Sequence, residues 1–438
     1  MHLFDAFKVE KDGCKCGREH FLPNIKVICK SGAIQELPAI INQFGAKKVF
    51  VFSDKNTFIA GGEKVIGVLQ NNKIEYTSYV IQNEKVKPDE KNVGSLIMHF
   101  DKSADLVIAV GSGVINDLTK VLCSVANKPF IIVGTAPSMD GYASATSSVT
   151  RDGLKVSLNT KCAEVIIGDL DILKKAPLHL VKAGIGDMLA KYVSICEWRI
   201  SNIINGEYYC EKTAQAVRAA LKKCIDNVEG LLKGDEDAIS AVFEGLVLSG
   251  TAMAFVDNSR PASGVEHYFS HVWDMRAVEF GTNYDLHGIQ CAIGTLKAIE
   301  IYNKLKKITP DREKAVQSAK NFDYESYSES LKAFLGKSAD GMIKAEREDG
   351  RYDLTKHALR LNKIIENWDE IRKVIDEELP PIERLYQVFD LLKLPKTPQE
   401  IGIDQNIYYQ TFTTTKDIRD KYVLSKLVWD LGIGEEIF

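Results

Sequence analysis

From about residue 24, the sequence alternates short, β-rich apolar runs with amphipathic stretches. The runs at 48–53, 74–81, 106–110, 130–134 and 164–168 have the length of strands. The stretches between them, such as 62–71 and 114–126, repeat their apolar residues with the period of a helix. Strands that alternate with helices form parallel sheets, and apolar runs such as VFVF and LVIAV suit strands covered on both faces. The chain is therefore predicted to begin with a parallel α/β domain.

The pattern changes after residue 168. From Leu178 onward helical patterns dominate, and little β-rich sequence returns before the C-terminus. A chain of 438 residues is long enough for two or three domains of ~150 residues each. We therefore expect an α/β domain over residues 1–175 and an all-helical domain over residues 176–438. The charged stretch at 355–379 is expected to be a helix with a solvated face.

Composition and charge exclude several classes of protein. Acidic residues outnumber basic ones by 60 to 56, and the net charge of −4 offers no basic excess to a nucleic acid or an anionic membrane. The longest apolar runs are near strand length, short of the ~20 residues of a membrane span, and the N-terminus has no secretory apolar segment. Nine cysteines, an odd number without a dense framework, indicate reduced thiols. We expect a cytoplasmic protein with no membrane span.

A Gly-rich turn follows the run LVIAV. Gly111, Ser112 and Gly113 open a predicted helix that continues through Asp117 and Lys120. Glycines let the backbone approach a pyrophosphate, and the N-terminus of a helix attracts it. The turn lacks the complete GxGxxG pattern, so a tight strand-to-helix turn without a ligand is an equally good interpretation.

Two further segments follow predicted strands. Asp54 comes directly after the run at 48–53, where a carboxylate can bind a ribose 2′-hydroxyl and repel a 2′-phosphate, which favours NAD over NADP. The alternative is that Asp54 caps the next turn. The hydroxyl-rich stretch 135–148 follows the run at 130–134 and offers small polar groups to a ligand, or is a flexible surface loop.

Three of the eight histidines fall within twenty-one residues of the helical half. His267 and His271 are spaced i and i+4, so they share one face of a helix, and His287 begins the next apolar helix. Asp187, in KAGIGDMLAKY, is expected at a helix start. One carboxylate with two or three imidazoles suits a catalytic divalent metal. Taken singly, Asp187 also fits an N-cap, His271 a core histidine and His287 a surface histidine.

A second cluster of metal-binding residue types lies near the N-terminus, in Cys14-Lys15-Cys16-Gly17-Arg18-Glu19-His20. Its spacing is not one of the usual zinc patterns, and no fourth ligand is evident. We interpret it as structural.

The order of these motifs resembles the sn-glycerol-1-phosphate dehydrogenases. The motifs are GSGVINDLTK, TAPSMDGYASATSSVT, AGIGDMLAKY, GVEHYFSH and LHGIQCAIGT. This family is a branch of the superfamily that also contains glycerol dehydrogenase, iron-dependent alcohol dehydrogenases and 3-dehydroquinate synthase. The resemblance extends to DIRDKYVLSKLVWDLGI, which is like the C-terminus of the bacterial, AraM-type members, and is weakest over 304–379. It implies a Rossmann-like nucleotide-binding domain followed by an all-α metal-binding domain, the dehydroquinate synthase-like fold.

The resemblance also assigns roles to residues. It makes Asp140 and His271 substrate contacts, with Asp187 near the substrate as well. It makes Asp187, His267 and His287 the ligands of one divalent metal, zinc, nickel or iron, whereas the spacing alone left His271 equally able to bind the metal. The implied contacts of NAD(H) or NADP(H) are Asp54, Gly111, Gly113, Val114, Ile115, Asn116, Asp117, Thr135, Ser138 and Ser144. The family's Gly-rich turn commonly begins with paired glycines, whereas Ser112 intervenes here.

The implied activity is the reversible reduction of dihydroxyacetone phosphate to sn-glycerol 1-phosphate by a homodimer or larger homo-oligomer. A Lewis-acidic metal would hold the carbonyl and adjacent hydroxyl while hydride arrives from the nicotinamide. One alternative is a glycerol dehydrogenase, which needs no phosphate pocket. A 3-dehydroquinate synthase-like cyclase is disfavoured because SMDGYASATSS replaces its Gly- and Lys-rich substrate loop. A non-catalytic binding protein is disfavoured because cofactor and metal residues are both present.

Overall fold

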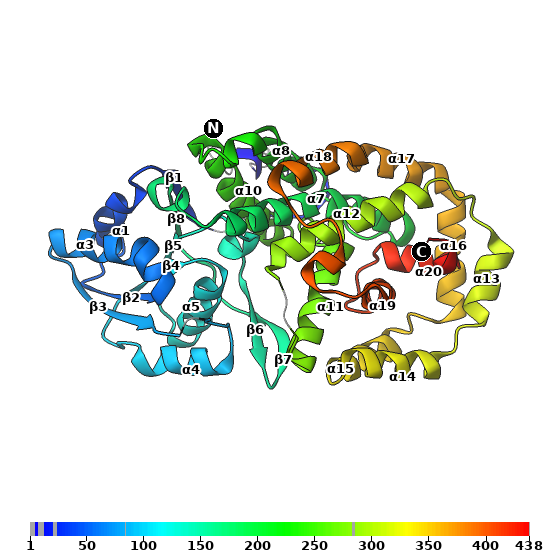
Figure 1. Cartoon of the computed structure of the whole chain (residues 1–438), viewed down its shortest axis with the longest axis horizontal. Helices are drawn as coiled ribbons and strands as arrows, with labels where there is room; N and C mark the ends of the chain where they lie inside the picture. The colour runs from blue at the N-terminus through cyan, green and yellow to red at the C-terminus, as the bar shows by residue number, and fades with distance from the viewer. Residues whose placement is uncertain (1–4, 8–12, 21–23, 84, 283–284, 438) are drawn as a thin grey trace. The chain divides into compact units, whose positions relative to one another are not determined.

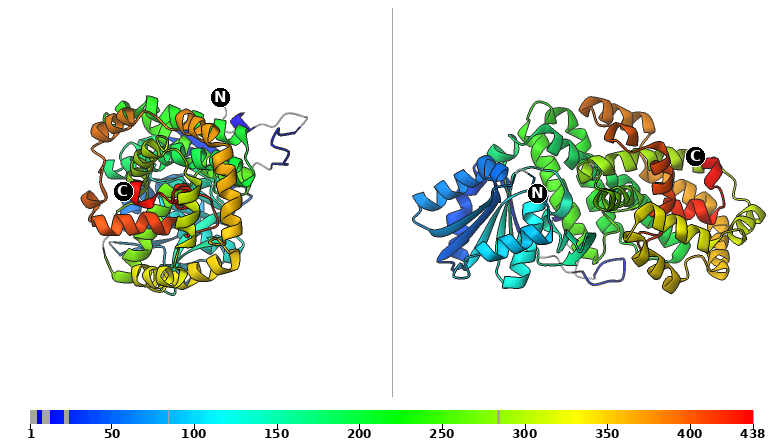
Figure 2. Two further views of the ribbon diagram at one scale, coloured as in Figure 1. Left: turned by 90° about the vertical axis from the view of Figure 1, so that its right-hand side faces the viewer. Right: turned by 60° about the horizontal axis from the view of Figure 1, so that its bottom comes forward.

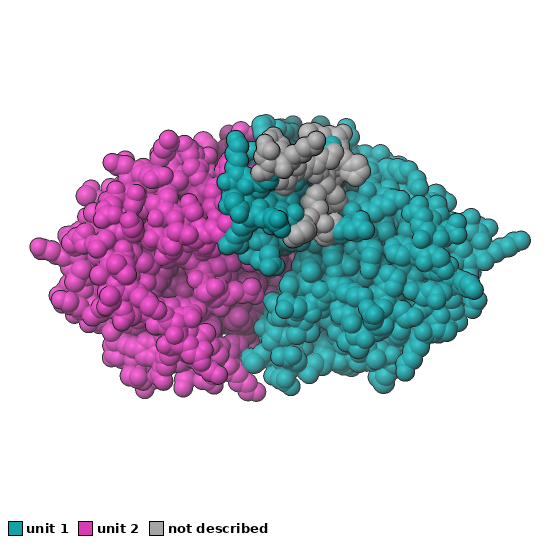
Figure 3. Space-filling model, turned by 180° about the vertical axis from the view of Figure 1, so that it is seen from behind, with its two compact units in different colours: residues 1–188, 215–258 teal, residues 189–214, 259–438 magenta. Residues whose placement is uncertain are grey.

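The computed structural model describes residues 5–7, 13–20, 24–83, 85–282 and 285–437. It divides into two compact units (Figure 3). The first unit comprises residues 1–188 and 215–258, and the second comprises 189–214 and 259–438. The domain boundary expected near residue 175, where β-rich sequence ends, stays a prediction.

The first unit is built on a six-stranded sheet in the order β1-β8-β5-β4-β2-β3. Every neighbouring pair is parallel, which confirms the predicted sheet. β1 was not among the predicted runs, because KVICK is short and only partly buried. The strands are β1 (Lys26–Lys30), β2 (Lys48–Asp54), β3 (Glu75–Ile81), β4 (Leu106–Gly111), β5 (Phe130–Gly134) and β8 (Val165–Asp169).

Helices cover both faces of this sheet. α1 (Leu37–Gln43) and α3 (Glu63–Asn71) lie on one face, and α4 (Glu90–His99) and α5 (Gly113–Ala126) lie on the other (Figures 1 and 2). The apolar side chains of α1 and α3 form one core cluster with the central strands. Its members include Leu37, Ile41, Val65, Leu69, Val51, Ile108 and Val133, all buried. Burial on both faces explains why these strands are continuous apolar runs.

A hairpin of β6 (Thr146–Arg151) and β7 (Leu154–Asn159) forms a separate antiparallel ribbon. We expected a loop over 135–148. The sequence TSSVTR lacks an apolar run because a two-stranded ribbon buries few of its side chains. The preceding loop contains one short 3₁₀ turn, η4 (Asp140–Ala143).

α10 (Glu236–Val256) is the one helix of the described residues that is long and apolar enough to cross a membrane. Within its most apolar window, 78% is buried inside the structure. A core helix has the same length and composition, so this finding is weak evidence for a span. The first unit also contains α6 (Leu170–Leu173), α9 (Val228–Leu231) and most of α8 (Glu211–Asp226).

The second unit is helical throughout its described residues, as predicted. The expected helix at 355–379 is two helices that meet at Asn367, whose side chain donates to the Lys363 carbonyl at 2.8 Å and so ends the first helix. The α-helices of the second unit include the C-terminal part of α7 (Leu178–Asn205), α11 (Val265–Phe280), α12 (His287–Leu305), α13 (Arg312–Lys320), α14 (Tyr324–Leu335), α15 (Ser338–Asp349), α16 (Leu354–Glu366), α17 (Trp368–Glu378), α18 (Ile382–Leu392), α19 (Gln405–Thr415), α20 (Leu424–Asp430) and α21 (Gly434–Ile437).

Candidate active site

The strand order of the first unit reverses between β2 and β4. The chain leaves β2 for β3 on one side and leaves β4 for β5 on the other. In open parallel sheets, ligands bind at the carboxyl edge beside such a reversal. Asp54 ends β2 and Gly111 ends β4, and Phe52 pairs with Ala109 in the register between them. Two predicted cofactor residues therefore flank the switch point of the sheet.

The turn after β4 requires its first glycine. A Cβ on Gly111 would lie 2.4 Å from Cβ of Ile115, so a side chain here would clash with the first turn of α5. Ser112 precedes α5 and makes no side-chain cap, and the N-terminus of α5 directly follows the carboxyl end of β4. Its positive dipole end is thus placed to attract an anion. Val114 and Asp117 are half-buried beside it, and Ile115 is buried.

Buried polar side chains join α5 to the loop after β5. Asn116 donates from Nδ2 to the Gly141 carbonyl at 3.0 Å. Lys120 donates from Nζ to the same oxygen at 2.6 Å and to the Thr146 carbonyl at 3.0 Å, and burial lowers the pKa of this lysine. Sequence reasoning missed Lys120, although it lies one helical turn after Asn116. Both side chains hold the loop in place.

The loop after β5 is well packed, which contradicts the interpretation as a flexible surface loop. The amide of Thr135 donates to the Gly111 carbonyl at 3.1 Å, in line with the pairing of Gly111 and Gly134 in the sheet. Thr135, Ser138 and Ser144 are each less than one-tenth exposed. The loop therefore lies beside the Gly-rich turn at the same sheet edge.

Asp54 has the capping role that was the alternative interpretation. Its Oδ1 accepts the Thr57 amide at 2.8 Å, and its own amide donates to Thr57 Oγ1 at 3.0 Å. This reciprocal pair is a capping box for the short α2 (Lys55–Thr57). A role toward a ribose stays a prediction.

Asp140 and Asp187 meet within the first unit. The amide of Asp140 donates to Asp187 Oδ2 at 2.8 Å, and Ser249 Oγ donates to Asp140 Oδ2 at 2.9 Å. Asp187 is completely buried. The backbone bond fixes the orientation of this carboxylate, and Ser249 fixes that of Asp140; Ser249 gave no signal in the sequence.

The expected helix start at Asp187 is wrong. α7 begins at Leu178, so Asp187 lies well inside the helix. Two nearby glycines resemble a helix boundary in the sequence, and one of them, Gly184, has a packing role. A Cβ on Gly184 would lie 1.9 Å from the Pro137 carbonyl oxygen, so the glycine allows the loop to contact the helix.

The three predicted histidines come together within the second unit. His267 and His271 share one face of α11, and His287 is the first residue of α12, as predicted. The ring centroids of His267 and His287 are 5.0 Å apart, and those of His271 and His287 are 6.1 Å apart. His267 is buried, and the other two are half-buried.

Hydrogen bonds orient two of these rings. His267 Nδ1 lies 2.8 Å from Glu266 Oε1, and this carboxylate is completely buried. His287 Nδ1 lies 2.8 Å from Ser270 Oγ, which donates its own hydrogen to Gln290 Oε1 at 2.6 Å. With Nδ1 as the donor in both rings, a tautomer inferred from these partners, each Nε2 keeps its lone pair for a metal. Neither Glu266 nor Ser270 was predicted from the sequence.

Cys291 joins this cluster and was not predicted, although it is spaced i+4 from His287. Ligand atoms of His267, His287 and Cys291 all lie within 4.8 Å of one another. Burial raises the pKa of the Cys291 thiol, and the imidazoles of His267 and His287 lower it. The two imidazoles together outweigh burial, so the pKa lies below its usual value. Nitrogen, oxygen and sulfur donors of this kind suit zinc, nickel or iron. The carboxylates of Asp140 and Asp187 in the first unit are thus chemically suited to bind a divalent metal. The cluster of His267, His287 and Cys291 in the second unit is suited to it as well.

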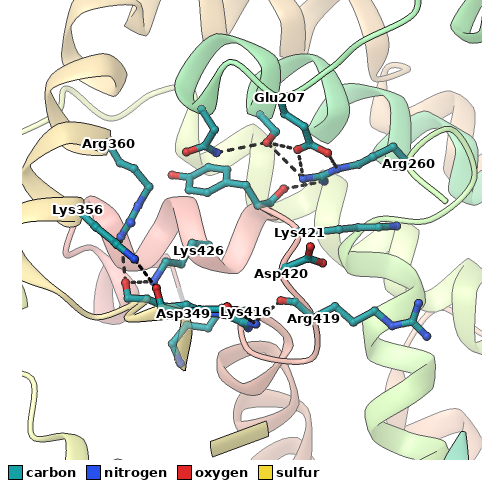
Figure 4. A pocket seen from close by; sticks show the side chains of 14 residues that line it. Glu207, Arg260, Asp349, Lys356, Arg360, Lys416, Arg419, Asp420, Lys421 and Lys426 are labelled. Atoms are coloured by element: carbon teal, nitrogen blue, oxygen red, sulfur yellow. Dashed lines mark hydrogen bonds and ion pairs between the residues drawn. The ribbon is translucent and has the colours of Figure 1, made fainter. Parts of the chain in front are cut away.

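A strongly basic pocket of about 510 Å³ lies within the second unit (Figure 4). Four of its cations have carboxylate partners: Arg260 with Glu207, Arg351 with Asp349, Arg360 with Asp430 and Lys416 with Asp417. Basic residues outnumber acidic ones in its lining by eight to three. The basic residues are Arg260, Arg351, Lys356, Arg360, Lys416, Arg419, Lys421 and Lys426. With the partners Asp430 and Asp417 included, basic residues still outnumber acidic ones by eight to five, and such an excess attracts an anion.

Lys421 connects the pocket to the histidine cluster. Its Nζ donates to the Ser263 carbonyl at 2.9 Å and lies 6.0 Å from the centroid of the Tyr268 ring, which is 6.1 Å from the ring of His271. Burial and the charges of Arg260 and Arg419 lower the pKa of Lys421 to about 7. In Figure 4, Lys421 and Arg419 extend to one side of the pocket, opposite Lys356 and Arg360.

Comparisons with known proteins show the family of this chain. The family described as iron-containing alcohol dehydrogenase matches residues 28–177. A protein of Halalkalibacterium halodurans named glycerol-1-phosphate dehydrogenase [NAD(P)+] is 33% identical over 70% of this chain and 78% of its own length. One of the same name from Bacillus subtilis is 33% identical over 67% of this chain and 77% of its own.

Solved structures share the fold at low identity. Glycerol dehydrogenase of Schizosaccharomyces pombe superposes with a TM-score of 0.61 at 16% identity, over 96% of this chain and 91% of that chain. An archaeal alcohol dehydrogenase from a Red Sea brine pool superposes with a TM-score of 0.60 at 14% identity, over 98% of this chain and 100% of that one. These likenesses establish the two-part fold of the polyol and alcohol dehydrogenases.

Proposed function

The chain belongs to the family of glycerol-1-phosphate dehydrogenases, and on this premise we propose that it catalyses the reversible, NAD(P)H-dependent reduction of dihydroxyacetone phosphate to sn-glycerol 1-phosphate. The enzyme is an oxidoreductase that uses a nicotinamide cofactor and a divalent metal. The observation that carries the choice of substrate is the basic pocket, because a dehydrogenase of unphosphorylated glycerol needs no such site.

The cofactor is proposed to bind at the switch point of the sheet. The pyrophosphate would lie at the N-terminus of α5, where Gly111 and Gly113 leave the backbone open. Asp54 would face the adenosine ribose with its second carboxylate oxygen, and its charge favours NADH over NADPH. Thr135, Ser138 and Ser144 would line the same edge.

The metal is proposed to bind to Asp187, His267 and His287. Two of these ligands are oriented by Glu266 and Ser270, and the third is held by the Asp140 amide. When bound, a divalent cation supplies Lewis-acid stabilisation of the alkoxide that forms during hydride transfer. Asp140 and His271 would orient the hydroxyl groups of the triose. Zinc, nickel and iron all suit this donor set.

The substrate phosphate is proposed to bind to Lys421 and Arg419. Both residues lie on the same side of the pocket. On this side Lys421 is close to the ring of Tyr268, which in turn lies beside the ring of His271. A charged lysine and a guanidinium bind a phosphate dianion through short, charge-assisted hydrogen bonds. A ketone that lacks the phosphate would make neither of these charge-assisted hydrogen bonds.

The test compares Lys421→Met with Lys356→Met, an exposed lysine on the opposite side of the same pocket. Loss of one charge-assisted phosphate contact corresponds to about 1.5–3 kcal/mol, so Lys421→Met should raise KM for dihydroxyacetone phosphate roughly tenfold to a hundredfold. The KM for dihydroxyacetone should not change. Lys356→Met should leave both close to wild type. Equal effects of Lys421→Met on both ketones would refute this assignment.

A further inference from the structure

The cluster near the N-terminus, which the proposed reaction does not use, is assembled in the structure. One ligand atom each from Cys14, Cys16 and His20 lie within 4.8 Å of one another. Cys16 Sγ and His20 Nε2 are 3.0 Å apart. The three side chains are half-buried, and the residues between them are exposed, so an ion from solvent can reach the cluster.

A tight turn brings the two thiols together. The amide of Gly17 donates to the Cys14 carbonyl at 3.0 Å, which closes the segment Cys14-Lys15-Cys16-Gly17 on itself. Gly13 and Gly17 flank this turn with φ of 87° and 80°, a left-handed conformation that glycine adopts without strain. The backbone is therefore suited to present both sulfur atoms on one side.

His20 is oriented as a metal-binding histidine. Its Nδ1 lies 2.8 Å from the Phe255 carbonyl oxygen, an acceptor, so Nδ1 carries the hydrogen and Nε2 presents its lone pair to Cys16. Its ring stacks on the ring of Phe255 with centroids 4.2 Å apart. A backbone carbonyl on the second nitrogen is the outer-sphere partner that fixes the tautomer in many metal sites.

The electrostatic surroundings favour a cation. Phe255 lies in the last turn of α10, where carbonyl groups lack helical partners and the helix dipole is negative. All nine cysteines in the described part of the chain are outside disulfides. Two thiols that remain reduced, beside an oriented imidazole, form a soft donor set that binds zinc in preference to the hard cations.

We propose that Cys14, Cys16 and His20 bind a zinc ion at a second site, separate from the catalytic metal. In tetrahedral zinc sites with Zn–S of about 2.3 Å and Zn–N of about 2.0 Å, ligand atoms are about 3.3–3.8 Å apart. The spacing of this cluster therefore needs only small side-chain adjustments. The ion attaches residues 13–20 to the C-terminal end of α10, where Phe7 also packs against Phe255 with ring centroids 5.1 Å apart. Its proposed role is structural, because it holds this surface segment against α10.

The experiment measures bound zinc per chain by mass spectrometry after dialysis of the full-length protein in zinc. Wild type should retain one equivalent more than Cys14→Ser, Cys16→Ser and His20→Gln. Cys29→Ser, which removes a half-buried thiol of β1 that contacts Ser240, is the matched control and should retain the wild-type amount. Thermal melts verify that each variant folds.

Cobalt substitution provides a spectroscopic readout that is independent of the zinc count. Two thiolate ligands give an intense near-ultraviolet charge-transfer band, which should disappear in Cys14→Ser/Cys16→Ser and persist in Cys291→Ser. The proposal is overturned if the second equivalent of zinc survives in the double variant. It is also overturned if the purified protein contains a Cys14–Cys16 disulfide, or if the cobalt band depends on Cys291 alone. None of these results depends on the proposed reaction.

Discussion

Nδ1 of His267 lies 2.8 Å from Oε1 of Glu266, its neighbour in sequence, and this carboxylate is completely buried. The same Oε1 accepts the Gly264 amide at 2.6 Å, so the carboxylate is fixed at the start of α11. Through this contact the first turn of the helix determines which nitrogen of His267 would face the proposed metal. Outer-sphere partners of this kind increase the basicity of the ligand.

Glu266→Gln should weaken metal binding by about tenfold to a hundredfold, because a neutral amide is a poorer acceptor for the imidazole hydrogen. Titration of the metal-free protein with zinc or nickel measures this. Glu370→Gln, an exposed change on α17, is the control and should bind like wild type. Unchanged affinity in Glu266→Gln would mean that the hydrogen bond does not support a metal ligand.

Removal of a proposed metal ligand should abolish turnover. Asp187→Asn and His267→Ala should each lower kcat by at least about a hundredfold, because Lewis-acid stabilisation of the alkoxide is worth several kcal/mol. Steady-state assays with saturating metal give kcat, and calorimetry gives the metal stoichiometry. Full activity in a metal-depleted Asp187→Asn protein would contradict the proposed chemistry.

Gly111→Ala should damage both folding and cofactor binding, since its Cβ would lie 2.4 Å from that of Ile115. Overpacking of this kind costs about 1–3 kcal/mol. Gly94→Ala is the matched control, because no atom lies within 4 Å of a Cβ at this position in α4. It should be neutral or stabilising by up to about 1 kcal/mol. Urea unfolding and NADH titration separate the two effects, and equal behaviour of the variants would contradict the close turn.

Asp54→Asn separates the two roles of Asp54. Asparagine is as good an N-cap as aspartate, so stability should change by only a few tenths of a kcal/mol. Loss of the negative charge should shift the ratio of kcat/KM values for NADPH and NADH toward NADPH by about tenfold, about 1.4 kcal/mol. An unchanged ratio would leave Asp54 with the cap alone.

The affinity for dihydroxyacetone phosphate should depend on pH through Lys421, whose pKa is lowered to about 7 by burial and by Arg260 and Arg419. Below this pH the ammonium group of Lys421 is charged and attracts the phosphate. Above it, Lys421 of the free enzyme is neutral and must take up a proton before the phosphate binds. KM should therefore rise with pH above about 7, by at most tenfold per pH unit. Dihydroxyacetone should show no such rise. Lys421→Arg keeps its charge and should remove the dependence, and an identical rise in that variant would exclude Lys421 as its source.

The same lowered pKa predicts the sign of a stability change. The pKa of a lysine in the unfolded chain is about 10.4, whereas that of Lys421 in the folded protein is about 7. Between these two pH values Lys421 is protonated in the unfolded chain and neutral in the folded protein, so stability rises with pH. The contribution of this residue thus destabilises the fold below pH 7, and the penalty is relieved as pH rises toward 10. Comparison of urea midpoints of wild type and Lys421→Met across this range measures it.

Features with a local cause could be predicted from sequence. Strands buried on both faces, the Gly-rich turn and the helix positions of His267, His271 and His287 all follow from the spacing of residue types. Features that depend on distant neighbours could not. Gly184 resembles a helix boundary until the Pro137 carbonyl is placed against it, and Lys120 resembles a surface lysine until it is found buried on the Gly141 carbonyl.

The basic pocket illustrates the same limit. Its cations come from segments between residues 260 and 426, and the chain as a whole is acidic, so no local charge run identifies it. Glu266 and Ser270 were overlooked for a different reason. Buried polar residues beside metal ligands carry no pattern of their own, and their role is defined only by the nitrogen atoms they contact.

The proposed activity is tested most directly by NADH oxidation with the metal-reconstituted protein, with dihydroxyacetone phosphate and, in parallel, with dihydroxyacetone, followed by chiral assignment of the product. We expect rapid turnover with the phosphate alone and formation of the sn-1 isomer. Preference for the unphosphorylated ketone would refute the proposed activity and would place the enzyme among the glycerol dehydrogenases.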